Sequence, residues 1–420
     1  MEIEIEISRK TLGLLYKIFI LLFFFGFSFW IFYLNYQTVQ NYPIVFGDEG
    51  YHMRIAKEMA SRKEYLLYLD YYKPNPPAYG YLSLFHFLEA FGFLISEWFA
   101  RLLLPLTVFL IAFSMFVIFW KLFDEKVALI SAILFQTFQS TVIYSVTFYV
   151  DTLLTLFSFL AFGFLLLYLK EKKLHYFYLS SAFSSILLIL KPMIPLVVFA
   201  STAFFVIYLV YLERNIRLLV FFLFPLLIFS SVILNNIFAY GKICVGYWIL
   251  SDYLNKFLNG SCEIKNVEYK DQYSFSARTE QIGSEVDLFS FGLLNYFDFA
   301  YGYSMFIIFT LVFSVTYIAI TRKIELLFPL LPAALLVIYS ISIDYFVYNN
   351  FGIFSRTEDT ARYLLFFNPF VAFYVSYSFV FLKDFLVSFR SKNQDKINLF
   401  FTVFFLISLF CLFKGCATFY

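Results

Sequence analysis

The most distinctive local feature of the sequence is a pair of adjacent acids, Asp48 and Glu49. Tyr51, Ile55 and Met59 follow at helical spacing, which predicts a short amphipathic helix with both carboxylates at its start. Two neighbouring carboxylates could hold a divalent metal. A structural role explains them equally well, because an aspartate is a good N-cap and a first-turn acid stabilises the helix dipole.

A basic residue, Lys73, lies in a proline-rich turn further along the chain. The three prolines of residues 74–77 fix an extended turn that leads into the next apolar segment. Lys73 is therefore expected at headgroup depth, where an ammonium group can bind a lipid phosphate. The structural alternative is an ordinary lysine whose charged end extends towards water.

More ionisable groups occur at the ends of later apolar segments. Asp151 precedes one segment, Lys191 ends another, and Arg362 opens a late one. Ionisable groups near membrane depth are costly and are functional candidates by default, although each alone could anchor a helix at the interface. More informative is that all of them are expected on the outer side of the membrane. The acids and the basic residues could then converge on one cavity in the outer leaflet.

The composition indicates that a membrane-embedded bundle positions these residues. The chain has 420 residues, of which 62% are hydrophobic and only 14% are charged, whereas soluble domains carry about 25% charged residues. This excludes intrinsic disorder, a coiled coil and a disulfide-rich secreted scaffold. A net charge of +2 gives no concentrated basic face for a nucleic acid. We therefore expect an all-α polytopic membrane protein.

Apolar segments that could cross a bilayer recur along the whole chain. They cover roughly residues 14–36, 78–95, 99–120, 127–147, 152–169, 175–190, 193–212, 217–238, 302–320, 326–343, 363–382 and 397–413. If residues 78–95 do not cross, the basic clusters around Lys10, Lys121, Lys172 and Arg217 share one face, as the positive-inside rule requires. Residues 78–95 also suit an interfacial helix. We therefore expect about eleven transmembrane helices and a cytoplasmic amino terminus.

We expect one membrane domain over residues 1–420 with two long outer segments. The first, residues 37–98, carries the acid pair and Lys73. The second, residues 239–301, is mixed polar and aromatic and is expected to form a flap between spans; it contains an N-glycosylation acceptor pattern at Asn259. Cys244 and Cys262 also lie in it, and their spacing leaves open whether they form a disulfide.

Several common sites are absent from the sequence. It contains no HExxH, GxxxxGK[ST] or GxSxG motif, and its three histidines are His52, His86 and His175. The sequence therefore gives no support to a histidine-rich metal site, a nucleoside triphosphatase phosphate loop or a hydrolase nucleophile elbow.

In their order, these residues resemble the polytopic glycosyltransferases of the GT-C class. The branch with protein O-mannosyltransferases and the aminoarabinose transferases of lipid A typically shows an acid pair after the first span, then a Lys-Pro-Pro-like turn. An acid that starts a later span, a lysine that ends another, and an Arg-Tyr pair follow. The matching residues here are Asp48-Glu49, Lys73-Pro74 with Pro76-Pro77, Asp151–Thr155, Leu190-Lys191-Pro192 and Arg362-Tyr363.

The resemblance is most specific over residues 1–200 and thin after about residue 215. Two departures concern the turn. Asn75 is inserted between its prolines, and Tyr72 occupies the position where some relatives have a carboxylate that helps to hold a metal. The resemblance therefore implies no required cofactor, although the acid pair leaves a divalent metal as an open alternative.

The resemblance implies that a sugar is transferred from a dolichyl- or undecaprenyl-phosphate donor to a hydroxyl acceptor on the outer or luminal face, with inversion. Residues 37–98 would then form the catalytic loop. Asp48 would be the general base and Glu49 would orient it or bind sugar hydroxyls. The charge on the leaving lipid phosphate would be stabilised by Lys73, Lys191 and Arg362. Further substrate contacts are expected from Tyr72, Asp151, Glu358, Asp359 and Tyr363.

The expected partners are the polyprenyl-phosphate sugar, a protein, glycan or lipid acceptor, and the bilayer, without a nucleic acid. We expect the plasma membrane of a prokaryote rather than an endoplasmic reticulum. The main alternative function is a lipid or solute transporter or flippase, and a non-catalytic subunit is a third. Transporters tend to show inverted repeats and a midplane site. This sequence shows neither paired halves nor midplane charges, which favours the transferase.

Overall fold

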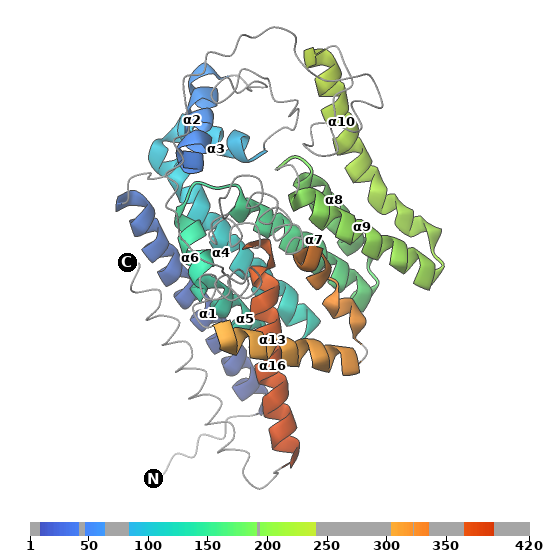
Figure 1. The fold of residues 1–420 in the computed structure, drawn as a ribbon. Coiled ribbons are helices and arrows are strands. Elements are labelled where there is room, and N and C mark those ends of the chain that lie inside the picture. Colours follow the sequence, from blue (N-terminus) through green and yellow to red (C-terminus); the bar gives the residue numbers. More distant parts are fainter. Residues whose placement is uncertain are drawn as a thin grey trace, which may run out of the picture.

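The computed structural model describes residues 9–41, 47–63, 84–190, 194–240, 304–321, 323–335 and 365–389. Within these ranges every regular element is a helix (Figure 1), which confirms the all-α class. The outer segment 239–301 lies almost wholly outside them, so its prediction as a flap stays a prediction. The same is true of the predicted site residues Tyr72, Lys73, Lys191, Glu358, Asp359, Arg362 and Tyr363.

Four helices in the described part are long and apolar enough to cross a membrane. They are α1 (Arg9–Asn41), α4 (Glu97–Leu122), α7 (Asp151–Glu171) and α16 (Asn368–Phe389), the last preceded by the short 3₁₀ helix η3 (Leu365–Phe367). Each has a counterpart among the apolar segments of the sequence. The count of eleven spans stays a prediction, because large parts of the chain lie outside the described ranges.

A fifth apolar segment is broken in the middle. The sequence predicts one continuous span over residues 127–147, and the structure corrects this to α5 (Glu125–Thr137) and α6 (Gln139–Val146), bent by 61°. The bend lies at Phe138, whose backbone is extended. Asn368 stabilises the far side of the break, because its amide donates to the hydroxyls of Ser140 and Thr141 at 2.8 and 3.0 Å. Such contacts allow irregular backbone at membrane depth.

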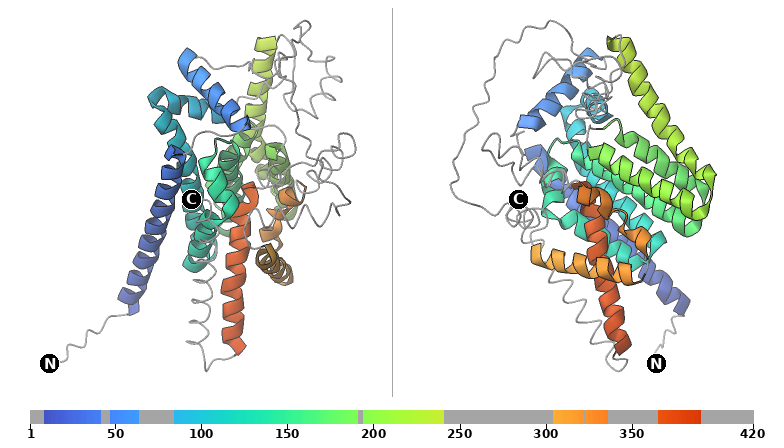
Figure 2. Two further views of the ribbon diagram at one scale, coloured as in Figure 1. Left: turned by 60° about the vertical axis from the view of Figure 1, so that its left-hand side comes forward. Right: turned by 45° about the vertical axis from the view of Figure 1, so that its right-hand side comes forward.

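Shorter helices make up the rest of the described bundle. They are α8 (Leu174–Leu187), α9 (Ile194–Glu213), η1 (Ile216–Phe222), α10 (Leu223–Tyr240), α13 (Ser304–Ile320) and η2 (Ile324–Leu327). Figures 1 and 2 show α8 and α9 side by side next to α7, with α10 alongside them.

Aromatic side chains hold the long helices together. The ring of Phe24 on α1 stacks on Phe116 of α4 with centroids 4.3 Å apart, and Phe119 of α4 stacks on Phe373 of α16 at 4.9 Å. Gly163 of α7 allows a close approach to α4, because a Cβ there would lie 2.8 Å from Ile118. Ring packing and small residues are what bring helices together where lipid removes the hydrophobic driving force.

One end of this bundle is rich in lysine. Lys170 donates to the carbonyls of Lys121 and Leu122 at 2.7 and 2.8 Å, and Lys172 forms an ion pair with Glu213. These contacts join the carboxyl ends of α4, α7 and α9, so the basic clusters at these three places share one end, as the sequence predicts. We call the segments 121–124, 170–173 and 213–214 the lysine-rich end.

Two short helices lie at the opposite end, beyond the carboxyl end of α1 and the start of α4 (Figure 2). They are α2 (Gly47–Arg62) and α3 (Leu84–Ile95). The 12 residues of α3 extend only about 18 Å, too short to cross ~30 Å of hydrocarbon. Residues 78–83 lie outside the described ranges, so the prediction that residues 78–95 do not cross stays a prediction. Because α2 begins at Gly47, Asp48 lies within its first turn and is not its N-cap, a shift of the one or two residues by which helix ends vary.

Candidate functional site

Helix α2, which carries the acid pair, packs on α3. Ile55 and Met59 of α2 and Ala90 of α3 form a small buried apolar cluster. The face of α2 that contains positions 55 and 59 also contains positions 48 and 52, because these are spaced by three or four residues. The position of Asp48 therefore falls on the face of α2 that packs against α3.

Helix α3 in turn lies very close to α4. A Cβ added at Gly92 would be 2.7 Å from the Cα of Ala100, a separation that real side chains do not adopt. Ser96, between the two helices, caps α4 by accepting a hydrogen bond from the amide of Phe99. The orientation of α3 is thus fixed relative to the second long helix.

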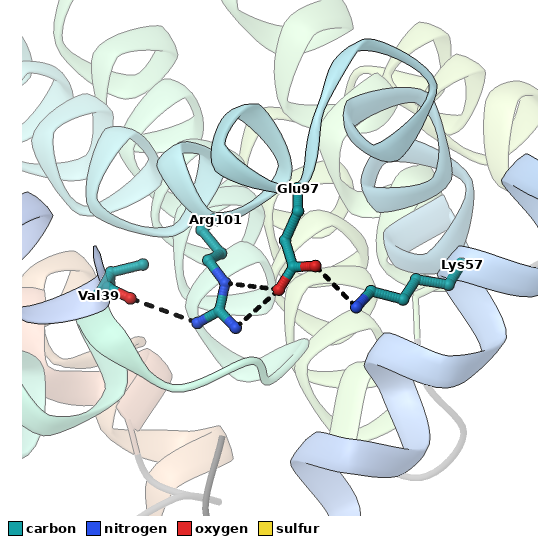
Figure 3. A network of polar contacts seen from close by, with 4 residues as sticks. All are labelled: Val39, Lys57, Glu97 and Arg101. Atoms are coloured by element: carbon teal, nitrogen blue, oxygen red, sulfur yellow. Dashed lines mark hydrogen bonds and ion pairs between the residues drawn. The ribbon is translucent and has the colours of Figure 1, made fainter. Parts of the chain in front are cut away.

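A charged network ties α2 to two long helices (Figure 3). Glu97 at the start of α4 accepts hydrogen bonds from Lys57 of α2 at 2.8 Å and from Arg101 at 2.9 and 3.2 Å. Arg101 also donates to the carbonyl of Val39 near the end of α1. Glu97 and Lys57 are about half exposed, and such pairs contribute only about 0–1 kcal/mol. The network therefore orients α2 more than it stabilises the fold.

The turn of residues 147–150, which leads into Asp151, lies against both short helices. Phe148 packs on the rings of Phe85 and Phe93 of α3 with centroids 5.8 and 6.0 Å apart, and Tyr149 meets His52 of α2 edge to face at 6.3 Å. Asp151 is the first residue of α7 and is only 1% exposed. We call α2, α3 and residues 147–151 the α2–α3 end.

The segment before Lys191 reaches the same place. The amide of Leu84, the first residue of α3, donates to the carbonyl of Ile189 at 3.1 Å. The stretch that follows the Lys73 turn and the stretch that precedes Lys191 are therefore adjacent, although 105 residues separate 84 from 189 in the sequence. Of the predicted site residues, the structure thus brings together the backbone positions of Asp48 and Glu49 and the whole of Asp151.

A histidine pair lies between α2 and α3. His52 Nδ1 and His86 Nε2 are 2.7 Å apart, and the His52 ring also contacts the edge of Phe85. His86 is only 4% exposed. Burial lowers the pKa of His86 well below its ordinary value, and the neighbouring charge of His52 lowers it further. At this separation one of the two ring nitrogens donates a hydrogen bond and the other accepts it.

Glu89 lies one helical turn after His86 on α3. It is 2% exposed, and burial raises the pKa of its carboxyl group well above the ordinary value. Its Oε2 atom has no hydrogen-bond partner among the residues that the structure describes, and neither has the buried hydroxyl of Thr147 in the neighbouring turn. A neutral Glu89 carboxyl can donate a hydrogen bond where an ionised one could only accept.

Sequence reasoning assigned no chemistry to this cluster. It took His86 and Glu89 only as residues that suit an interfacial helix, whereas both are buried inside the protein. The available signal was the spacing: His52 follows Asp48 by four residues, and Glu89 follows His86 by three. Helical spacing predicts that each couple shares a face, but it cannot pair residues 34 positions apart.

The geometry of the two histidines fits a hydrogen bond rather than a shared metal ion. Two nitrogens bound to one tetrahedral zinc at about 2.0–2.1 Å lie about 3.3 Å apart, which is more than the observed 2.7 Å. No group of three or more His, Cys, Asp or Glu residues suited to a metal occurs in the described part of the chain. The expectation that no cofactor is required stays a prediction, because the side chains of Asp48 and Glu49 are not among the described groups.

Comparison with known proteins places this arrangement in context. Residues 75–234 match the family described as dolichyl-phosphate-mannose-protein mannosyltransferase. The match includes α3, Asp151 and Lys191, but begins after Asp48, Glu49 and Lys73. No curated protein sequence matches the chain.

Two solved structures share the fold. ArnT from Cupriavidus metallidurans in the apo state is 14% identical, with a TM-score of 0.54 over 86% of this chain and 59% of that chain. ArnT from the same organism bound to undecaprenyl phosphate is 13% identical, with a TM-score of 0.52 over 86% and 60%. This chain thus spans about 59% of the length of ArnT. At such identity the likeness concerns the fold.

These findings confirm the resemblance drawn from the sequence motifs. The shared fold extends well beyond the first 200 residues, where the motifs were concentrated. The chain shares the fold of ArnT, and its residues 75–234 match the sequence pattern of the dolichyl-phosphate-mannose-protein mannosyltransferase family.

Proposed function

We propose that this protein transfers a sugar from a polyprenyl-phosphate donor to a hydroxyl acceptor on the outer or luminal face of a membrane. One observation carries the proposal: α2, with Asp48 and Glu49 in its first turn, is held against α3, α4 and the turn before Asp151 at one end of an ArnT-like bundle. The ArnT structure bound to undecaprenyl phosphate supports the donor class.

The proposed reaction is a single displacement. The acceptor oxygen attacks the anomeric carbon, the bond between that carbon and the phosphate oxygen breaks, and the electron pair leaves with the polyprenyl phosphate. Attack opposite the leaving group inverts the anomeric centre. Asp48 takes the proton of the acceptor hydroxyl as general base, a contribution of about 10²–10⁴-fold in rate. Glu49 orients Asp48 or binds sugar hydroxyls.

The basic residues act on the leaving group. Negative charge grows on the lipid phosphate as its bond to the sugar breaks, and Lys73, Lys191 and Arg362 stabilise it. The hydrogen bond between Leu84 and Ile189 supports the place of Lys191, because Ile189 precedes it by two residues and the bond holds that segment against the start of α3. Asp151, Tyr72, Glu358, Asp359 and Tyr363 are proposed substrate contacts. We propose no required metal or cofactor.

A donor test decides the proposal. Purified protein in lipid is incubated with a panel of radiolabelled polyprenyl-phosphate sugars, without nucleotide sugars and with membrane extract as acceptor, and release of free polyprenyl phosphate is followed. Asp48→Asn is compared with Glu58→Gln, a carboxylate on another face of α2. We expect release from the wild type and Glu58→Gln, and release about 10²–10⁴-fold slower from Asp48→Asn. No release from any donor would contradict the transferase and favour a transporter.

A further inference from the structure

A group that removes a proton in every turnover must also lose it before the next turnover. The position proposed for the general base is at the α2–α3 end, where His86, Glu89 and Asp151 are buried. His52 lies four residues after Asp48, about one helical turn along the same face of α2. The geometry around His52 therefore bears on where the proton goes.

We propose that the His52–His86 pair is a proton relay that takes the proton from Asp48 and passes it out of the site. The inference rests on the proposed function, and adds two residues to it. Asp48 transfers the proton to His52, which releases the proton on its other ring nitrogen to His86 through the 2.7 Å contact. The pair gains one proton and one positive charge, and returns both to water before the next donor binds.

The surroundings fit a transient carrier. Among the described residues near the pair, the titratable groups are Glu89 on α3, Tyr149 in the turn before α7 and Asp151 at the start of α7, and α2 adds positions 48 and 49. Two charges 2.7 Å apart repel strongly, so the pair holds one extra proton at most and titrates as a unit. Burial of His86 disfavours the charged form, which drives the proton onward and does not trap it.

Glu89 is a buried carboxyl group one helical turn from His86. It lies on the same face of α3 as His86, is almost completely buried, and keeps one carboxyl oxygen without a partner in the described residues. A buried ionisable group with no ion pair is unfavourable for stability, and such groups concentrate at functional sites. As a neutral carboxyl it can donate a hydrogen bond without adding a negative charge that would hold the proton on His86.

The test separates proton transfer from packing. His86→Gln keeps a side-chain amide that can hydrogen-bond His52 but cannot carry a proton. We expect kcat for polyprenyl-phosphate release to fall roughly 10-fold or more, with KM for the donor unchanged and the protein still monodisperse. His175→Gln is the matched control, because His175 lies on α8 beside the lysine-rich end and contacts Tyr176. Its kcat should equal that of the wild type.

A pH profile provides the second readout. Wild-type kcat should fall as the pH drops through the apparent pKa of the pair, because a pair that already holds a proton cannot accept another. This limb should be absent from the double variant His52→Gln/His86→Gln and present in His175→Gln. Wild-type kcat and an unchanged profile in His86→Gln would overturn the relay. If His86→Gln does not fold, His52→Gln decides by the same criteria. If the wild type releases polyprenyl phosphate from no donor, the proposed function itself is refuted. That outcome differs from failure of the relay alone, in which the wild type and His86→Gln are equally active.

Discussion

The two ends of the bundle handle charge in opposite ways. At the lysine-rich end, Lys172 and Lys173 are more than half exposed and pair with Glu213 and Glu171. At the α2–α3 end, His86, Glu89 and Asp151 are each less than 5% exposed. Exposed pairs form at little cost and contribute little, whereas buried ionisable groups are unfavourable and persist where they have a task. We infer from this contrast that the lysine-rich end helps to orient the protein in the membrane and that the α2–α3 end carries the proposed chemistry.

The strongest way to test this contrast is to remove the proposed base. Asp48→Asn should lower transfer by about 10²–10⁴-fold without changing thermal unfolding in detergent, because the amide preserves shape. Glu49→Gln should be milder. Donor release and differential scanning fluorimetry on the same preparations measure both. Wild-type turnover in Asp48→Asn would show that the base is elsewhere.

The second test displaces α3 while leaving every charged residue in place. Gly92→Ala puts a methyl group 2.7 Å from the Cα of Ala100, so α3 must move away from α4. We expect a loss of about 1–3 kcal/mol and a clear fall in kcat, because the partner of His52 moves with α3. Gly26→Ala is the control, since nothing lies within 4 Å of a Cβ at that position. Equal behaviour of the two variants would contradict the close packing.

The third test loosens the orientation of α2. Glu97→Gln weakens its contacts with Lys57 and Arg101, and should reduce kcat by roughly 10-fold with at most about 1 kcal/mol of stability lost. Glu125→Gln makes the same change in the first turn of α5, beside the lysine-rich end, and should leave kcat unchanged. A stability loss without a loss of rate would mean that the network is only structural.

The smallest effect is expected at the lysine-rich end itself. Glu213→Gln removes the partner of Lys172 and should change stability by less than about 1 kcal/mol, with donor release as in the wild type. A large fall in kcat from this variant would remove the distinction between the two ends.

The sequence predicted those elements whose signal is local. The apolar segments locate α1, α4, α7 and α16, and periodicity after the acid pair predicts α2 to within its ends. The bend at Phe138 carries no glycine or proline, and the side chain that supports it is Asn368, 228 positions from Ser140. No local pattern can report such a contact.

The site was predictable in part for the same reason. Asp48, Glu49 and Asp151 attract attention because charge next to an apolar run is visible in one dimension. The pairing of His52 with His86 depends on how α2 crosses α3, which is set by the packing of Ile55 and Met59 on Ala90. The burial of Glu89 could not be predicted from the sequence either, because the composition of its helix is typical of an interfacial helix.

The break at Phe138 has a mechanical consequence. It leaves α6 as a strut of eight residues, about 12 Å long. One end is fastened by the amide of Asn368, six residues after Arg362, and the other runs into the turn that lies on His52. Any displacement of Asn368 is therefore carried along α6 to that turn or absorbed at the bend at Phe138.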